Sequence, residues 1–432
     1  MKPLPLWLQR LVTCLCDPAW TRLEILYADA LTREIQSLFR TFGKGPPRCV
    51  SALFCGTAAR PSPYLCLDWS VEGRNITGDV EPMRIAQIAP LHEAVPPKLY
   101  GGTERVVSFL TEELVALGHD VTLFASGDSV TSAKLEAIWP RALRLDPAIR
   151  DPIAPHMLLM EAARRMADEF DVLHFHMDYW PFSLFGRQRT PFVTTMHGRL
   201  DLAELQPVFN IFPNAPLVSI SDAQRRPLPQ ARYVATVHHG LPANLLTPQP
   251  VKQEYLAFLG RIAPEKGPDR AIRIARAAGI RLKIAAKVDR VDEVYFDTII
   301  RPMIAEGGVE MIGEINDAQK PAFLSGAIGL LMPIDWPEPF GLVMIEAMAC
   351  GTPVIAFNHG SVPEIVEPGV SGFIVEDEAG AIAAVKRLGE LSRATVRSRF
   401  DARFTAKRMA EDYLDIYHTL AGEDRSVLRA SR

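Results

Sequence analysis

From residue 83 onward, short runs of apolar residues alternate with segments in which apolar residues recur every three or four positions. The run RIAQIA (84–89) predicts a buried strand, and the apolar spacing after Thr103 predicts a helix that Gly118 ends. Similar runs predict strands over residues 120–126, 172–176, 191–196, 216–221, 255–260, 282–288, 309–313, 329–334, 353–357 and 372–375. This alternation is typical of βαβ units, which build parallel sheets covered by helices.

The chain of 432 residues is long enough for two such domains. Residues 237–254 contain scattered prolines and no clear period, which indicates a linker. We therefore predict an α/β protein with two Rossmann-like domains that face one another across a cleft, residues 83–242 and 243–400, followed by a helix over residues 401–424. Residues 1–82 lack this pattern, and we expect them to be an extension that is disordered or outside the working fold.

Composition and charge exclude several classes of protein. The formal net charge of −4 gives no basic field for nucleic acid, and no apolar run reaches the ~18 residues of a membrane span. The N-terminus is a poor signal peptide, because Gln9 and Arg10 interrupt its apolar run. We expect a cytoplasmic protein with at most peripheral membrane contact and no nucleic-acid partner.

Candidate metal ligands are poorly spaced. Five of the six cysteines lie in the first 82 residues without a C-x2-C pair, and His174 and His176 share a strand face without a further ligand at metal spacing. There is no Asp-x-Asp motif either. The sequence therefore predicts neither a metal site nor a cofactor.

Two glutamates stand out in the stretch PEPFGLVMIEAMACGTPVIA (337–356). Glu338 lies in a predicted loop, whereas Glu346 lies on a helix whose other residues are apolar, so a solvent-facing position does not fit it. A carboxylate there suits the two neighbouring hydroxyls of a ribose. A hydrolase pair is the rival use of two glutamates, but nothing in this spacing sets the ~5 Å that a retaining hydrolase needs.

The start of the same helix offers backbone donors. Pro339 favours an extended residue before it, so the helix begins at Gly341 or Leu342. The N–H groups of Phe340, Gly341 and Leu342 then have no helical partner and have the positive end of the helix dipole behind them. Such groups suit hydroxyls or phosphate.

Three further sites are candidates, each with an ordinary alternative. In GRIAPEKG (260–267), Arg261 and Lys266 flank a proline turn after a strand and suit a diphosphate, although solvated loop charges are equally expected. In YGGTERVV, Gly101 and Gly102 allow close approach to a ligand, although a simple tight turn explains them too. His197 ends a predicted strand and reaches the cleft as a donor, unless it is a structural histidine.

Together these motifs resemble the retaining glycosyltransferases of family 4, which have the GT-B fold. The resemblance covers roughly residues 83–420. PEPFGLVMIEAMACGTPVIA matches the E-x7-E motif of that family, GRIAPEKG its Arg/Lys diphosphate motif, YGGTERVV its first-domain glycine loop, and GSVPEIVEPGVSGFIV the segment that follows. The chain departs from the family in its HHG, where asparagine often precedes glycine, and in Ala286, where glycine is frequent.

The resemblance implies roles on the donor. Arg261 and Lys266 would bind the donor diphosphate and stabilise the charge of the leaving group. Glu346 would hold the ribose. Glu338 and the N–H groups of residues 340–342 would hold the sugar hydroxyls.

It also implies roles for the first domain. Gly101 and Gly102 would approach the donor phosphate or the acceptor, and His197 would lie against the sugar. The last helix resembles the one that crosses back onto the first domain in this family.

The implied activity is transfer of a hexose from a nucleotide-diphosphate sugar, UDP-glucose type first and GDP-mannose type second, to an unidentified glycan, lipid or small molecule. Retention without a clear protein nucleophile fits front-face attack, in which the donor phosphate accepts the proton of the acceptor. The two cations would replace a metal ion. Two alternatives stay open: a nucleotide-sugar epimerase of the same fold, and a nicotinamide oxidoreductase, against which the absence of G-x-G-x-x-G argues.

Overall fold

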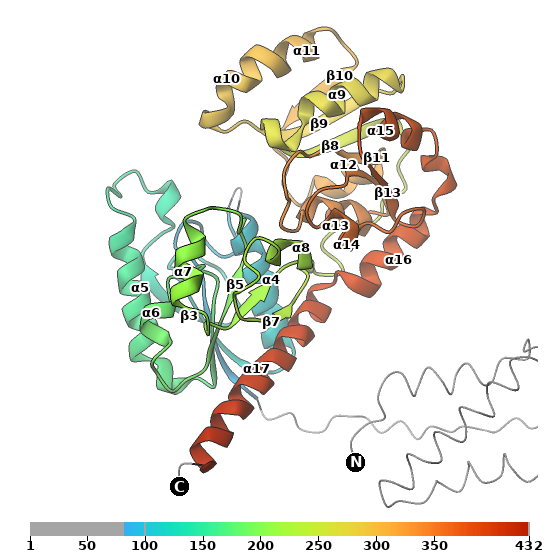
Figure 1. The fold of residues 1–432 in the computed structure, drawn as a ribbon. Helices are drawn as coiled ribbons and strands as arrows, with labels where there is room; N and C mark the ends of the chain where they lie inside the picture. The colour runs from blue at the N-terminus through green and yellow to red at the C-terminus, as the bar shows by residue number, and fades with distance from the viewer. Residues whose placement is uncertain (1–81, 99–100, 431–432) are drawn as a thin grey trace, which may run out of the picture. The chain divides into compact units, whose positions relative to one another are not determined.

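The first domain, coloured blue to green in Figure 1, contains a sheet of parallel strands. The sheet has seven strands in the order β3-β2-β1-β4-β5-β6-β7. The structure is a computed structural model that describes residues 82–98 and 101–430, with side chains as far as Gly422. The expected N-terminal extension and its cysteines lie outside the described residues, apart from Pro82. The strands are β1 (Arg84–Ile88), β2 (Asp120–Ser126), β3 (Lys134–Trp139), β4 (Val172–Phe175), β5 (Phe192–Met196), β6 (Leu217–Ser219) and β7 (Tyr233–Thr236).

The second sheet has six parallel strands in the order β10-β9-β8-β11-β12-β13. They are β8 (Tyr255–Arg261), β9 (Leu282–Lys287), β10 (Val309–Gly313), β11 (Ala327–Met332), β12 (Val354–Phe357) and β13 (Gly372–Val375). In both sheets the strand order reverses beside the first strand, as in dinucleotide-binding folds. The prediction of two Rossmann-like domains is therefore confirmed.

Helices connect the strands of each sheet. In the first domain they are α4 (Gly102–Ala116), α5 (Ile153–Arg165), α6 (Phe182–Phe185), α7 (Leu205–Ile211) and α8 (Asp222–Arg225). In the second they are α9 (Pro268–Ala277), α10 (Glu293–Tyr295), α11 (Arg301–Ala305), α12 (Lys320–Ser325), α13 (Leu342–Ala349), α14 (Val362–Ile365), α15 (Glu378–Val385) and α16 (Arg393–Arg403), and α17 (Ala406–Ala430) follows. Short 3-10 or π turns are η2 (Leu143–Leu145), η3 (Ala167–Glu169), η4 (Pro264–Lys266), η5 (Arg290–Asp292), η6 (Phe296–Ile300) and η7 (Leu388–Glu390).

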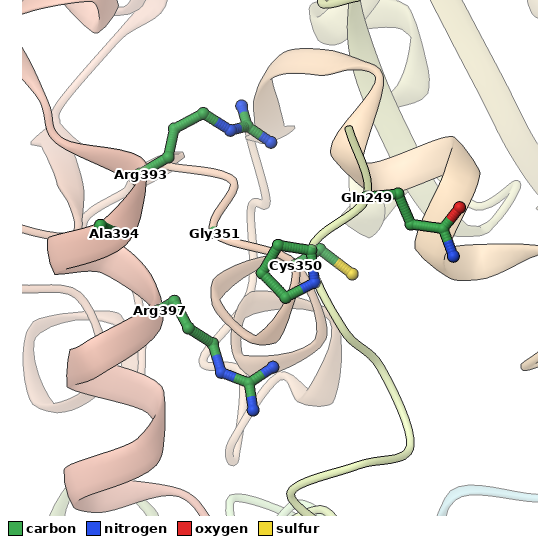
Figure 2. Close-up of a pocket in the computed structure, with 7 residues that line it drawn as sticks. Gln249, Cys350, Gly351, Arg393, Ala394 and Arg397 are labelled. Atoms are coloured by element: carbon green, nitrogen blue, oxygen red, sulfur yellow. The ribbon is translucent and has the colours of Figure 1, made fainter. Parts of the chain in front are cut away.

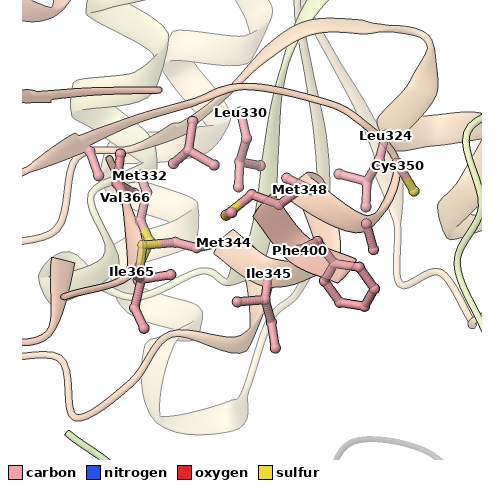
Figure 3. Packing of buried hydrophobic residues seen from close by; sticks show 14 of the residues in the cluster. Leu324, Leu330, Met332, Met344, Ile345, Met348, Cys350, Ile365, Val366 and Phe400 are labelled. Carbon is pink, nitrogen blue, oxygen red and sulfur yellow. The ribbon is translucent and has the colours of Figure 1, made fainter. Parts of the chain in front are cut away.

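Side chains along a strand alternate between the two faces of its sheet, and helices cover both faces of each sheet. In the second sheet, one face packs on α12, α13, α14 and α16, with Leu330 and Met332 against Met344 and Met348 (Figure 3). The other face packs on α9 and α15. Helix α13 is thus part of a hydrophobic core, which explains why its residues are apolar on nearly every side.

Helix α17 packs beside α4 on one face of the first sheet (Figure 1). Its Met409, Tyr413 and Tyr417 are fully or almost fully buried against β1 and α4. Complete burial of an apolar side chain of this size stabilises a fold by roughly 1.5–3 kcal/mol. The first part of α17 therefore belongs to the core of the first domain, although the chain reaches it from the second.

Candidate functional site

Gly341 sets the start of α13. It has φ +80°, a left-handed conformation that glycine adopts without strain, and Leu342 is the first helical residue. Phe340 before it is 2% exposed. Among the described residues, no protein acceptor receives the backbone N–H groups of Phe340 and Gly341. The structure thus places two unpaired donors at the positive end of a buried helix.

Glu338 lies in the loop before α13 and contacts Lys266. Its Oε2 accepts hydrogen bonds from Lys266 Nζ (2.5 Å) and Trp336 Nε1 (3.0 Å), and the Lys266 ammonium also lies over the Trp336 ring. Gly360 fixes this loop from behind, because a Cβ there would lie 2.3 Å from the Glu338 carbonyl oxygen. The structure therefore brings together a candidate diphosphate ligand and a candidate sugar ligand.

Arg261, the last residue of β8, is surrounded by carboxylates. Its guanidinium donates a hydrogen bond to Glu265 and lies 3.7 Å from Asp292 and 3.9 Å from Asp289. Arg261 and Lys266 therefore have separate acidic partners, and a diphosphate that binds both cations has to compete with those carboxylates.

Glu346 is 2% exposed and is held by two cations. Its Oε1 accepts hydrogen bonds from Arg105 Nη1 (2.6 Å) and Lys320 Nζ (2.8 Å), and Asp317 pairs with the same two cations at 2.8 and 3.1 Å. Burial by itself raises the pKa of Glu346, but Lys320 and Arg105 outweigh it and lower that pKa to about 2. Glu346 is therefore ionised at neutral pH, as a ribose ligand requires.

Sequence reasoning missed Arg105 and Lys320. Arg105 lies on α4 in the first domain, 241 residues from Glu346, so no local pattern connects them. The sequence feature that could have identified Arg105 is its position in the motif YGGTERVV, three residues after Gly102. The ion pair joins the two domains at the candidate donor site.

The glycine loop of the first domain also meets this site. Gly101 caps α4, and a Cβ there would lie 2.9 Å from Pro97 Cβ and 3.0 Å from Glu104 Oε2, which leaves no room for a side chain. A Cβ on Gly102 would lie 3.9 Å from Leu342 Cδ1. The start of α4 and the start of α13 are therefore neighbours.

His197 follows β5 and ends a chain of buried hydrogen bonds. Its Nε2 lies 2.9 Å from His176 Nδ1, and His176 Nε2 lies 2.7 Å from Gln87 Oε1. Gln87 Nε2 in turn donates to the Tyr417 hydroxyl on α17 (3.0 Å). Burial lowers the pKa of His197 to about 3, so its ring is neutral at physiological pH.

The orientation of the Gln87 amide determines which nitrogens carry protons. Since Gln87 donates to Tyr417, its oxygen accepts from His176 Nε2–H, and neutral His176 offers a bare Nδ1 to His197. His197 then donates through Nε2, and its buried Nδ1, which has no partner among the described residues, is a hydrogen-bond acceptor. The sequence had suggested a donor at this position.

His239 connects His197 to the start of α13. The His197 and His239 rings are stacked with centroids 5.3 Å apart, and the His239 centroid lies 4.9 Å from that of Phe340. His197 thus lies beside the candidate donor site, with a free lone pair. His174, in contrast, is an ordinary structural histidine, because Tyr417 and Thr195 satisfy both of its nitrogens.

A cavity of about 390 Å³ in the second domain contains no comparable unpaired or charged groups that are free for a ligand (Figure 2). Its arginines are occupied by backbone carbonyls: Arg393 donates to Ala327 and Ser325, and Arg397 to Leu246 and Ala349. The bond from Arg397 to Ala349 holds α16 against the C-terminal end of α13. Within residues 82–98 and 101–430, no group of three or more His, Cys, Asp or Glu is placed to hold a metal ion, and no described helix is long and apolar enough to cross a bilayer.

Family models match both halves of the described chain. Residues 247–402 match "Glycosyl transferases group 1", and residues 100–237 match "Glycosyltransferase Family 4". A D-inositol 3-phosphate glycosyltransferase of Mycolicibacterium smegmatis is 32% identical over 174 residues, which are 37% of this chain and 39% of the relative. The chain thus spans less than half the length of that relative.

Solved structures share the fold. AviGT4, a glycosyltransferase involved in avilamycin A biosynthesis, has 24% identity and a TM-score of 0.62 over 79% of this chain and 98% of its own. Anabaena HepE in complex with UDP-glucose has 18% identity and a TM-score of 0.60 over 78% of this chain and 100% of its own. Both are similar to the described part of the chain across its two domains.

Proposed function

Because this chain belongs to the family 4 glycosyltransferases of the GT-B fold, we propose that it transfers a hexose from a nucleotide-diphosphate sugar to an acceptor hydroxyl and forms an α-glycosidic bond. The observation that carries the proposal is the start of α13, where unpaired N–H groups, Glu338 and Lys266 lie together. A UDP sugar of the UDP-glucose type is the first choice of donor, supported by the UDP-glucose complex of HepE, and a GDP-mannose type is the second.

The donor would be held by groups from both domains. Arg261 and Lys266 bind the diphosphate, and the sugar hydroxyls lie against Glu338 and the N–H groups of Phe340 to Leu342. Glu346 binds the ribose through Oε2, because Oε1 already receives both Arg105 and Lys320. Gly102 allows the first domain to approach the donor without a side chain in between.

The reaction then needs no protein nucleophile. The acceptor oxygen bonds to C1 of the sugar on the face from which the C1–O bond to the diphosphate breaks, and the acceptor proton passes to the departing phosphate oxygen. Arg261 and Lys266 stabilise the charge that develops on the diphosphate. His197, neutral and with a bare Nδ1, accepts a hydrogen bond from a hydroxyl of the transferred sugar.

The first experiment is thermal unfolding of the full chain with UDP, GDP, UDP-glucose, GDP-mannose or NAD, each with and without a chelator. A ligand at 100 times its Kd stabilises the folded protein by about 2.7 kcal/mol, which is a measurable shift. We expect a shift with one nucleotide family, unchanged by the chelator. A shift with NAD alone, or with none of these ligands, contradicts the proposal.

Turnover tests the role of the cations. Arg261→Ala should lower transfer by about 100-fold or more, as loss of a leaving-group contact does. Arg301→Ala, which removes an exposed arginine of α11, is the matched control and should keep wild-type turnover. Activity of the Arg261 variant within a few-fold of wild type refutes the role.

Incubation with donor alone separates transfer from epimerisation, because an epimerase converts the donor sugar without an acceptor.

A further inference from the structure

A cavity of about 320 Å³ lies in the first domain, where the chain leaves β1, β4 and β5. This volume falls within the range of small-molecule sites, about 300–1,000 Å³. Its lining residues are Pro90, His92, Thr103, Glu104, His156, His176, Met177, Asp178, Trp180, His197 and Gly198.

The cavity adjoins the candidate donor site at two points. His197 lines the cavity and also stacks on His239, which contacts Phe340 before α13. Thr103 lines it next to Gly102, which approaches Leu342. A molecule in this cavity therefore lies beside the sugar that the donor site would hold.

The charged residues that line the cavity are acidic. Its lining contains the carboxylates Glu104 and Asp178 but no lysine or arginine. Burial, His156 and, third, Arg144 lower the pKa of His92, and Arg144 itself forms an ion pair with Glu93 at 3.1 Å that compensates its charge. A phosphate group in this cavity would meet two carboxylates and no lining cation.

Asp178 is the lining residue with the most unusual backbone conformation, and its carboxylate lacks a partner in the described structure. Among the described residues it is the one non-glycine residue with a positive φ, +47°, a conformation that is often found at functional sites. Its carboxylate has neither a hydrogen bond nor an ion pair within the described structure, and desolvation raises its pKa. Asp178 is nevertheless exposed to solvent, as expected of a carboxylate that accepts hydrogen bonds at a concave surface.

Rings form another part of the wall. The His156 and Trp180 centroids are 5.4 Å apart, and those of His92 and His156 are 4.9 Å apart. His156 has no hydrogen-bonding capacity left for a ligand, because Nδ1 donates to Pro152 and Nε2 accepts from Leu91 N–H. Ring faces next to carboxylates suit the C–H face and the hydroxyls of a sugar ring.

We propose that this cavity binds the acceptor, and that the acceptor is a neutral polyhydroxylated ring, a sugar or a cyclitol without a phosphate group, with Asp178 accepting a hydrogen bond from one of its hydroxyls. The inference rests on the proposed glycosyl transfer, because an acceptor has meaning only if a donor is used. His197, which lines the cavity and stacks on His239, has a buried Nδ1 without a partner among the described residues.

The test uses the full chain, the donor identified by thermal shift, and acceptors in matched pairs: myo-inositol with inositol 3-phosphate, and glucose with glucose 6-phosphate. The neutral member of at least one pair should have a kcat/KM at least about tenfold above that of its phosphate. Asparagine also adopts positive φ, so Asp178→Asn keeps the local backbone conformation. The variant should raise the acceptor KM about tenfold or more and leave the donor KM within about twofold. Asp168→Asn, at an exposed aspartate of η3, is the control and should match wild type.

The outcomes separate the two proposals. Preference for the phosphorylated members, or an Asp178→Asn variant that behaves like the control, overturns the acceptor inference while the transferase proposal stands. A donor that binds and is slowly hydrolysed, with no transfer to any neutral acceptor, also overturns it. If no nucleotide sugar binds or turns over, the proposed function fails first. A thermal unfolding curve of Asp178→Asn confirms that a raised KM is not a loss of folded protein.

Discussion

Replacement of Glu346 by glutamine tests the buried ion cluster that joins the two domains. Glu346→Gln keeps the size of the side chain and removes the charge that Arg105 and Lys320 contact at 2.6 and 2.8 Å. Asp317 remains beside both cations, so neither is left without an acidic partner. The loss therefore measures the contribution of one buried carboxylate.

The magnitude follows from the pKa of Glu346, which is lowered from 4.5 to about 2. Because the folded value lies below the unfolded one, the stabilisation is fully present above about pH 4.5 and is lost as the pH falls toward 2. At about 1.4 kcal/mol per pKa unit, the ionised carboxylate stabilises the fold by about 3 kcal/mol at pH 7 and by about 1 kcal/mol at pH 3. The glutamine variant lacks this dependence on pH.

Thermal unfolding at pH 7 and at pH 3–4 gives the measurement. For a domain of 150–250 residues, about 3 kcal/mol corresponds to a fall in Tm of about 6–12 °C at pH 7, and the difference from wild type should shrink as the pH falls. Glu390→Gln, at an exposed carboxylate paired with Arg387, is the control and should change the unfolding free energy by less than about 1 kcal/mol. A Tm difference for Glu346→Gln that stays constant with pH, or that is as small as the control, refutes this account of the cluster.

Two further variants test the donor side. Glu265→Gln removes the carboxylate bonded to Arg261, so UDP-glucose should bind about three- to tenfold more tightly in calorimetry, and weaker binding would show that Glu265 does not compete with the diphosphate. Gly360→Ala should lower the unfolding free energy by about 1–3 kcal/mol in thermal unfolding and weaken donor binding, because its Cβ meets the Glu338 carbonyl oxygen. Gly369→Ala shares the positive φ but has free space around it, so an equal loss in both variants would contradict the argument from close approach.

The fold was predictable because most strands carry continuous apolar runs. Each predicted run has a strand in the structure, but β3 and β7 were missed. Both are edge strands, and their side chains are only partly buried, so they lack the apolar run that marks an interior strand. Exposure alone is not the reason, because the edge strand β10 has no fully buried side chain either and was still predicted from its apolar residues. Burial on both faces favours a continuous apolar run, but it does not by itself decide whether a strand is found.

The candidate site was predictable where its residues share one segment. Glu338, Gly341 and Glu346 lie within a single loop and helix, so their spacing in the sequence determines their spacing in the structure. Arg105 and the hydrogen-bond chain from Tyr417 to His197 depend on how separate elements pack, and such contacts leave no local signal. The direction of that chain is set by a side-chain amide far from His197 in the sequence, which periodicity does not reveal.

The charged groups of the proposed donor site are paired with one another before any donor binds. Lys266 is paired with Glu338, Arg261 with Glu265, and Glu346 with Arg105 and Lys320. Binding of the proposed donor would therefore replace carboxylates by phosphates as partners of the cations. The affinity would be the difference in free energy between these two sets of ion pairs. The unpaired N–H groups at the start of α13 would add to it, because no protein group in the described part of the chain competes for them. We infer that these N–H groups supply a large share of the net donor affinity. In the proposed reaction the two cations act mainly at the transition state. The leaving diphosphate then gains negative charge and attracts the cations more strongly than Glu265 and Glu338 do.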